Sequence, residues 1–385
     1  MGKVSLGVDR FLAEGTFRKF AGLKLAVLTN QSAVTSCLSY TITELRDRGI
    51  GIACVLAPEH GFWTEYYEGE RVLSSYEEAL GLRVRSIYGQ ERGESYKVLD
   101  EVDGVLVDIQ DVGVRFYTYV SALFETMEYA AKYGASRFVV LDRPNPLGGY
   151  VMEGPLLEEG YRSYVGYYRI PLRFGLTLGE LARYYNSVRG LGLEVTVVPL
   201  AGYFRSMDVL DLDVPWVPPS PAIPDKETVF TYPSLALLEG TNVSEGRGTY
   251  TPFKVFGAPF IDPFKLASKL NSMRLPGVVF RPMYFRSRYS KYVGQKCGGV
   301  FVHVVDRRAV RVVNIGLHIL RAIYELYPEH LTFTENNGRF YTDLLLGTAK
   351  GREAVVSGDV EGFLRYASDS IADFEEQARA AMIYT

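Results

Sequence analysis

The chain has 385 residues, of which 47% are hydrophobic and 23% are charged, and its formal net charge is −3 at pH 7. This composition is typical of a globular protein of about two domains, and it lacks the excess of positive charge that favours nucleic acid as a partner. Neither a signal peptide nor a membrane span of ~20 apolar residues is recognisable, so we expect a cytoplasmic protein without a membrane partner.

The first two hundred residues alternate between short apolar runs and helical patterns. The runs expected to form strands lie at 23–28, 51–57, 103–109, 137–141 and 193–199, and helices are expected over 39–48, 117–133 and 178–185. Most of the runs are continuously apolar, which is typical of strands buried on both faces of a parallel sheet. Residues 1–205 are therefore predicted to form a Rossmann-like α/β domain with a parallel sheet. Thr177 and Glu180 fit a capping box, so we interpret Glu180 as structural.

The remaining residues, 206–385, are predicted to form a smaller α/β domain. A loop-rich segment over 214–251 comes first. Helical patterns over 264–273, 311–327 and 360–383 follow, with strands near 277–285 and 298–305.

Polar side chains follow four of the predicted strands at their carboxyl ends. In open parallel sheets ligands bind at this edge, so four loops are expected to converge on one crevice. Any single loop could instead be turn chemistry, because Asn, Asp, Gly and Pro are favoured in turns whatever the function. The residues are Asn30, Gln31, Glu59, His60, Gln110, Asp111, Asp142, Arg143 and Asn145.

A further stretch that is dense in polar residues, EGTNVSEGRGT, occupies 239–249. It interleaves three glycines with Glu239, Asn242, Glu245 and Arg247. Glycines let a backbone approach a ligand closely, and the fork of an arginine suits a carboxylate. The same composition also occurs in solvated surface loops.

The sequence lacks the motifs that are typical of nucleotide-binding proteins, of α/β-hydrolases and of zinc sites. The first strand is followed by TNQSAV rather than G-x-G-x-x-G, and neither a P-loop nor a G-x-S-x-G elbow is present. Three cysteines and four dispersed histidines offer no ligand spacing for zinc, and we interpret the cysteines as reduced. We therefore expect no nucleotide cofactor and no metal.

Several motifs occur together in the order of a single family, and together they span nearly all of residues 5–385. The chain resembles the NamZ-type exo-β-N-acetylmuramidases, glycoside hydrolase family 171, formerly a domain of unknown function. The motifs are PEHGF at 58–62, GE at 69–70, DIQDVGVRFYTY at 108–119, LDRPNPLGG at 141–149, EGP at 153–155, LTLGELA at 176–182, PSP at 219–221 and EGTNVSEGRGT at 239–249.

The resemblance implies a Rossmann-like catalytic domain, a smaller domain closing the active-site cleft, and a carbohydrate substrate. The implied reaction is release of N-acetylmuramic acid from the non-reducing end of peptidoglycan fragments, as in cell-wall recycling. Glu59, beside His60, is then the expected general acid, because burial would raise the pKa of its carboxyl as such a role requires. Glu70 is the second catalytic candidate, since the Gly-Glu of the family is kept.

Substrate contacts are expected from the residues at and near the strand ends and from the 239–249 stretch. Asp111 and Asp142 could orient sugar hydroxyls, and Tyr117 and Tyr119 offer rings and phenolic donors. Arg247 is the first candidate for the lactyl carboxylate of muramic acid, ahead of Arg143 and Arg115. Asp142 and Arg143 could equally form a structural pair, and the tyrosines could belong to the core. Further contacts are expected from Asn30, Gln110, Asn145, Glu239, Asn242 and Glu245.

Three departures from the family pattern concern the substrate. The segment Trp63–Glu68 is bulkier and more acidic than usual, and Phe174 and Ala222 replace an expected histidine and asparagine. We interpret Glu65 and Glu68 as a solvated acidic lobe, which would oppose an anionic sugar. A glycosidase for a different amino sugar, or a sugar-binding protein with altered or lost catalysis, therefore remains an alternative.

Overall fold

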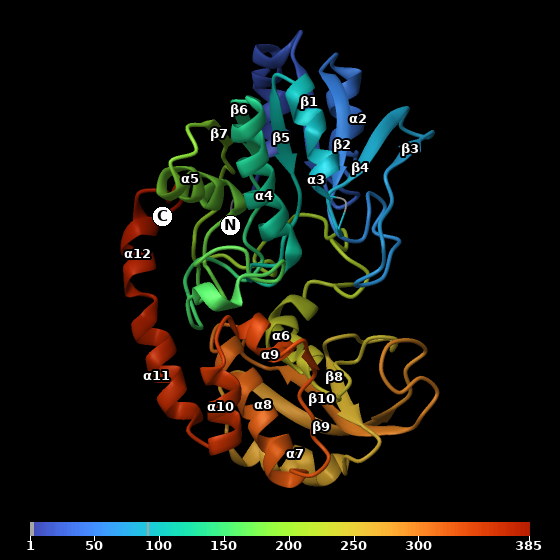
Figure 1. Cartoon of the computed structure of the whole chain (residues 1–385), viewed down its shortest axis with the longest axis vertical. Coiled ribbons are helices and arrows are strands. Elements are labelled where there is room, and N and C mark those ends of the chain that lie inside the picture. Colours follow the sequence, from blue (N-terminus) through green and yellow to red (C-terminus); the bar gives the residue numbers. More distant parts are fainter. Residues whose placement is uncertain (1–3, 91) are drawn as a thin grey trace.

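A seven-stranded sheet forms the first domain of the computed structural model, which describes residues 4–90 and 92–385 (Figure 1). The strand order is β3-β4-β2-β1-β5-β6-β7, and every neighbouring pair is parallel except β3 and β4. This confirms the predicted Rossmann-like parallel sheet. The strands are β1 Lys24–Thr29, β2 Gly51–Ala57, β3 Ser75–Glu77, β4 Leu82–Ser86, β5 Gly104–Asp108, β6 Arg137–Leu141 and β7 Glu194–Val198.

Helices cover both faces of this sheet (Figure 1). Alternate residues of one strand point to opposite faces, so that Leu28 joins the core with α4 while Val27 joins the core with α1 and α2. The predicted capping box holds, because Thr177 accepts a hydrogen bond from the Glu180 backbone and Glu180 accepts one from the Thr177 backbone. The helices are α1 Gly7–Ala13, α2 Thr41–Asp47, α3 Arg92–Ser95, α4 Thr118–Tyr133 and α5 Leu178–Arg189.

The second domain packs helices on a three-stranded antiparallel sheet of order β8-β10-β9. The smaller α/β unit is thus confirmed. The helix predicted over 360–383 is two helices that meet at Ile371, and no glycine or proline marks the break in the sequence. The strands are β8 Val255–Ala258, β9 Val278–Phe285 and β10 Cys297–Val304, with a small β11 Glu335–Asn336 and β12 Arg339–Phe340 pair. The helices are α6 Thr228–Leu235, α7 Pro263–Ser272, α8 Val312–Leu326, α9 Tyr341–Leu346, α10 Lys350–Ser357, α11 Val360–Ser370 and α12 Ala372–Arg379.

The two domains are connected at two places. Residues 199–227 lead from β7 to α6 without a helix or strand, and the predicted boundary at 205 falls in this segment. The helices α11 and α12 then run along one side of the molecule back to the first domain (Figure 1). There the Tyr384 hydroxyl donates to Asp142 Oδ2 at 2.6 Å, and the Ile383 N–H donates to Glu180 Oε1 at 2.8 Å.

None of the helices in the described ranges is long and apolar enough to cross a membrane.

Candidate active site

A cavity of about 240 Å³ lies between the two domains. The loop after β2 and the segment entering α4 form its wall on the first domain, and the 239–249 stretch forms part of the opposite wall. Ligand pockets commonly measure roughly 300–1,000 Å³, so this cavity suits a single small unit better than an extended polymer. Its lining comprises Glu59, His60, Glu68, Gly69, Tyr88, Phe116, Tyr117, Thr118, Tyr164, Val165, Ser220, Ala222, Ile223, Tyr232, Glu239, Arg247, Phe253, Tyr341 and Leu345.

Glu59 lies two residues beyond the end of β2 and lines the cavity. Its side chain is buried, and two donors fix it: Thr118 Oγ1 lies 2.7 Å from Oε2, and the Gly69 N–H lies 3.2 Å from Oε1. Thr118 begins α4, so the carboxylate is anchored to a regular element as well as to its own loop. The Glu59 carboxylate is therefore held in a fixed orientation toward a ligand in the cavity.

His60 lines the cavity beside Glu59 and has a left-handed backbone, with φ of 75°. Such a conformation is uncommon outside glycine and is found where the surrounding structure requires it. The ring Nδ1 lies 2.8 Å from the Tyr66 carbonyl oxygen, which can only accept, so Nδ1 carries a proton. Burial lowers the pKa of the imidazole, so a neutral ring leaves its Nε2 as an acceptor.

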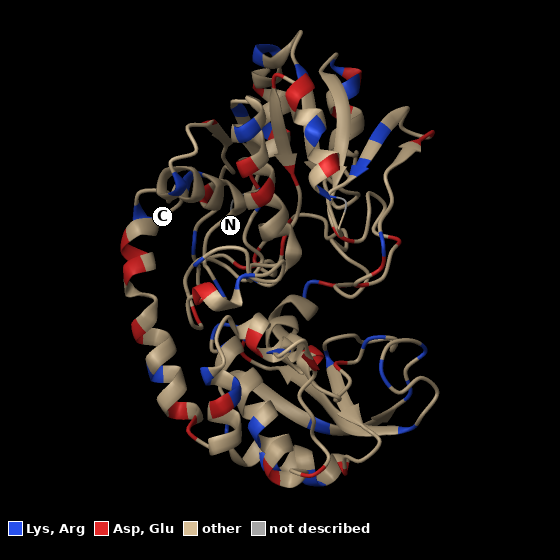
Figure 2. Ribbon diagram, in the orientation of Figure 1, with Lys and Arg blue, Asp and Glu red and all other residues tan. Residues whose placement is uncertain are grey.

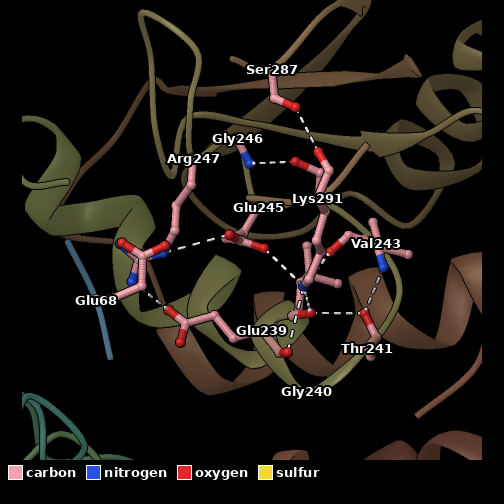
Figure 3. A network of polar contacts seen from close by, with 12 residues as sticks. Glu68, Glu239, Gly240, Thr241, Val243, Glu245, Gly246, Arg247, Ser287 and Lys291 are labelled. Carbon is pink, nitrogen blue, oxygen red and sulfur yellow. Dashed lines mark hydrogen bonds and ion pairs between the residues drawn. The ribbon is translucent and has the colours of Figure 1, made fainter. Parts of the chain in front are cut away.

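A network of charged side chains closes the side of the cavity formed by the second domain (Figure 3). The Arg247 guanidinium lies 3.1 Å from Glu68, 3.1 Å from Glu239 and 3.5 Å from Glu245, and it packs over the Phe253 ring at 4.7 Å. Burial raises the pKa of Glu239 to about 7, and the Arg247 charge opposes that shift. A carboxyl with this pKa is partly protonated at neutral pH and can donate as well as accept.

Positive charge gathers on the loop between β9 and β10, whereas both signs are mixed over most helices (Figure 2). Lys291 of this loop extends to the network, where its ammonium lies 3.0 Å from Glu245 Oε2 and 2.9 Å from the Val243 carbonyl oxygen. The loop thereby fixes the backbone of the 239–249 stretch below the cavity.

Tyrosine rings supply much of the remaining wall. The hydroxyl oxygen of Tyr117 is buried and forms no hydrogen bond of normal geometry with the described residues. Burial raises its pKa, and weak hydrogen bonding with the Ser220 and Tyr119 side chains opposes that shift. Buried polar atoms are almost always paired, so an unpaired hydroxyl in a cavity wall indicates a place where a ligand can bond. Sugar-binding sites commonly combine an aromatic ring face with a phenolic hydrogen-bond donor in this way.

The other polar residues predicted at the strand ends hold the loops beneath the cavity. The Asn30 amide donates to the Tyr119 hydroxyl at 2.8 Å, and the Tyr119 hydroxyl donates to the Pro219 carbonyl oxygen. Gln110 donates to the carbonyl oxygens of Asp111 and Pro144. Asn145 donates to the Leu176 carbonyl oxygen at 2.8 Å. None of Asn30, Tyr119, Gln110 and Asn145 is among the residues lining the cavity.

One interpretation of the sequence was that Asp142 and Arg143 form a structural pair. In the structure their side chains do not pair with one another. Asp142 is fully buried and accepts hydrogen bonds from Thr177, Gly179 and Tyr384, and burial raises its pKa to about 6. Arg143 instead forms a buried ion pair with Asp108.

Among the described residues, the hydrogen-bond partners of the Arg115 guanidinium are backbone carbonyl oxygens and not carboxylates. Its guanidinium donates to carbonyl oxygens on both domains, at 2.7 Å to Ile170 and 2.7 Å to Leu346, and burial without a charged partner lowers its pKa to about 9. Of the three arginines considered for a substrate carboxylate, Arg247 is therefore the one that faces the cavity.

Three further predicted residues, Glu70, Asn242 and Glu245, lie outside the cavity wall. Glu70 is exposed and accepts a hydrogen bond from the Tyr67 N–H at 2.9 Å, in a neighbouring groove. Asn242 bonds to the His330 carbonyl oxygen and the Thr332 N–H, so it joins two loops of the second domain. Glu245 contacts Arg247 from below without lining the cavity.

The acidic segment 63–68 corrects one interpretation. Glu65 is exposed as expected, but Glu68 lines the cavity and pairs with Arg247, so the assignment of Glu68 to a solvated lobe is wrong. Trp63 donates to Glu77 and packs on Phe62. Of the other two departures, Phe174 is buried in the core and Ala222 lines the cavity.

Asp111 gives a testable pH dependence of stability. Burial raises its pKa from 3.8 to about 7, and the Gly113 N–H opposes the shift. The folded protein therefore holds this proton more tightly, so the stability that it contributes is complete below about pH 4 and is lost as the pH rises through 7. Asp111→Asn should remove this part of the slope. We expect the difference in urea midpoint between wild type and variant to change across that window, and a constant difference would contradict the assignment.

Comparison with known proteins places the chain in a family. The sequence model for the N-terminal part of the exo-β-N-acetylmuramidase NamZ matches residues 25–227, and the model for its C-terminal part matches residues 230–384. A peptidoglycan β-N-acetylmuramidase NamZ of Bacillus subtilis is 39% identical over 384 residues, which cover 99% of this chain and 92% of that protein.

Two solved structures share the whole architecture. Both are DUF1343 family proteins of Bacteroides fragilis, with TM-scores of 0.89 and 0.77 at 32% and 26% sequence identity. Each match covers 100% of this chain and 99% of the other. The sequence models, the relative and the shared fold agree: this chain belongs to the NamZ family of exo-β-N-acetylmuramidases.

Proposed function

We propose that the protein is an exo-acting glycosidase that releases β-linked N-acetylmuramic acid from the non-reducing end of peptidoglycan fragments. The observation that supports this most directly is the cavity between the domains, where Glu59 and His60 face the Arg247 network. The B. subtilis relative carries the corresponding name, and the family models cover both walls of the cavity.

The cavity holds the groups that glycoside cleavage requires. A proton must reach the leaving oxygen, and a second carboxylate, a water or the acetamido group of the substrate must attack the sugar carbon. Glu59 is the proposed proton donor, since Thr118 and Gly69 orient its carboxyl at the wall. His60 presents Nε2 beside it. Glu239, with its pKa of about 7, is proposed to hydrogen-bond the sugar from the opposite wall.

The shape of the site favours action at a chain end. The cavity adjoins a larger groove of about 830 Å³, and the two share Gly69, Tyr88 and Tyr164 in their walls. One sugar unit in the small cavity would leave the rest of the glycan in the groove. Glu70 lines this groove, so we propose that it contacts the leaving group and not the reacting bond.

A panel of chromogenic β-glycosides tests the proposal. Aryl glycosides of N-acetylmuramic acid, N-acetylglucosamine and glucose would be assayed side by side, and we expect turnover of the N-acetylated sugars alone. Fragments with a muramic acid at the non-reducing end should lose that single residue, which mass spectrometry would detect. Saturable sugar binding without turnover anywhere in the panel would overturn the enzyme and favour a binding protein.

A further inference from the structure

A groove of about 850 Å³ lies mainly on the second domain, beside the cavity. Tyr67 in its wall directly precedes Glu68 of the cavity wall, and Gly248 directly follows Arg247. The groove is larger than the cavity of about 240 Å³, so it has room for more than one sugar unit. No step of the proposed function uses it.

Every charged side chain that lines this groove, within the described part of the chain, is a cation. The three are Arg286, Arg288 and Lys296, which belong to the loop between β9 and β10. Lys291 of the same loop is paired with Glu245, whereas none of the three forms an ion pair with a described residue. A hollow lined by one sign of charge concentrates ions of the opposite sign, so the groove favours an anionic ligand although the whole chain carries a net charge of −3.

Exposed tyrosine rings lie beside these cations. Tyr250 is 92% exposed and Tyr284 is 51% exposed, and both line the groove. The Lys296 ammonium lies 4.1 Å from the centroid of the Tyr284 ring, so one cation and one ring form a single contact surface. Large apolar groups that gather in the solvent commonly mark an interaction site. A tyrosine suits a sugar in particular, because its ring can pack on a sugar ring while its hydroxyl bonds a sugar hydroxyl.

The backbone of the groove is fixed by hydrogen bonds. The Arg288 N–H donates to the Gly248 carbonyl oxygen at 2.9 Å, and the Ser287 hydroxyl donates to the Lys291 carbonyl oxygen at 2.6 Å. Gly248 has a φ of 77°, and a β-carbon at this position would lie 2.5 Å from the Tyr289 carbonyl oxygen, so the contact between the two loops requires glycine. The groove is therefore preorganised, which lowers the entropy lost when a ligand binds.

We propose that this groove is a second carbohydrate site, which binds a glycan strand whose sugars carry carboxylates. Sugar rings of the strand pack on Tyr250 and Tyr284, and its carboxylates pair with Arg288 and Lys296. The ligand class is a strand of N-acetylated amino sugars in which alternate units bear a lactyl carboxylate. No carboxyl group is among the described residues that line the groove, so the strand is held there and not cut. Binding at this site goes beyond the proposed function, which concerns one terminal sugar in the cavity.

The test measures strand binding directly, by calorimetry on the whole protein. The probe is a hexasaccharide of alternating N-acetylglucosamine and N-acetylmuramic acid. N-acetylglucosamine stands at its non-reducing end, so that release of muramic acid from that end cannot begin. A hexamer of N-acetylglucosamine is the neutral counterpart. We expect the acidic strand to bind about tenfold more tightly than the neutral strand at low salt, and the difference to shrink at about 1 M salt, where charges are screened within about 3 Å.

A double variant locates the binding in the groove. Tyr250→Ala combined with Lys296→Gln removes one ring and one charge, and we expect it to weaken binding of the acidic strand about tenfold, the scale of one lost charge-assisted hydrogen bond. Its kcat and KM on an aryl N-acetylated glycoside should stay within about twofold of wild type. Phe264→Ala combined with Lys265→Gln is the matched control, because it removes an exposed ring and an exposed charge from α7 of the same domain. The control should change neither measurement.

The outcomes separate the second site from the proposed function. A loss of strand binding confined to the groove variant supports the second site even if no glycoside is turned over, and in that case the enzyme activity alone is refuted. Unchanged strand binding in the groove variant, or an equal loss in the control, overturns the second site even if glycosides are hydrolysed. Equal affinity of wild type for the acidic and neutral strands, or no binding of either, also overturns it. Circular dichroism melts of each variant confirm that the fold is intact.

Discussion

Glu59→Gln is expected to lower kcat on an aryl N-acetylated glycoside by roughly 10²–10⁴-fold, with little change in KM. The amide has nearly the shape of the carboxyl and its oxygen can still accept from Thr118, so the cavity wall should keep its form. What it cannot do is give a proton to the leaving oxygen. Initial rates over a range of substrate concentrations, with the two kinetic constants fitted separately, measure the effect.

Glu65→Gln provides the control, because it removes a carboxylate from the same loop at an exposed position. Its activity should stay within about twofold of wild type, as for most surface substitutions. A Glu59→Gln enzyme that retains most of its kcat would show that the proton comes from elsewhere. Glu239, across the cavity and with a pKa near 7, would then be the first residue to substitute.

Arg143→Met is expected to destabilise the protein by about 3–5 kcal/mol, the usual effect of breaking a buried ion pair from one side. Arg143 and Asp108 form that pair with exposed fractions of 6% and 0%, and Arg143 also donates to the Val34 carbonyl oxygen at 2.7 Å. Removing the guanidinium leaves the Asp108 charge buried with only neutral donors such as Thr41. Urea unfolding followed by far-UV circular dichroism should show the loss.

The partner substitution distinguishes a structural pair from a substrate contact. Arg143→Met combined with Asp108→Asn should recover much of the lost stability, because no buried charge remains unpaired. Sugar affinity in any folded variant should remain close to that of wild type. A stable Arg143→Met protein with a large loss of sugar affinity would instead restore Arg143 to the binding site.

The central sheet could be predicted because its signal is local. The run GIACVLA is apolar throughout and stops at Pro58, and β2 occupies the same seven residues. Strand β4, with the sequence LRVRS, lies near the sheet edge, where alternate side chains remain accessible to solvent. It therefore has no continuous apolar run. Its absence from the prediction has that physical cause.

The candidate site was only partly predictable. The strand-end rule finds Glu59 and His60, which line the cavity, but it also selects Asp142, whose partners Thr177, Gly179 and Tyr384 lie 35 to 242 residues away along the chain. A polar side chain at a strand end can bind a ligand, or it can hold a loop in place by hydrogen bonds. Which of these roles it has depends on partners that lie far away in the sequence. Glu68 and Tyr341 were missed because the packing of one domain against the other brings them to the cavity.

The returning tail after α12 limits how the cavity can open. A pair of domains joined by one linker can swing about many axes, but here the 199–227 segment and the tail bound to Asp142 and Glu180 join them twice. Arg115 adds a rigid spacer, with carbonyl oxygens of both domains on one guanidinium. Two attachment points leave one easy rotation, about the line that connects them. We therefore expect the cavity to open for substrate by a hinge rotation about that line, and we expect removal of the residues after α12 to release the second restraint.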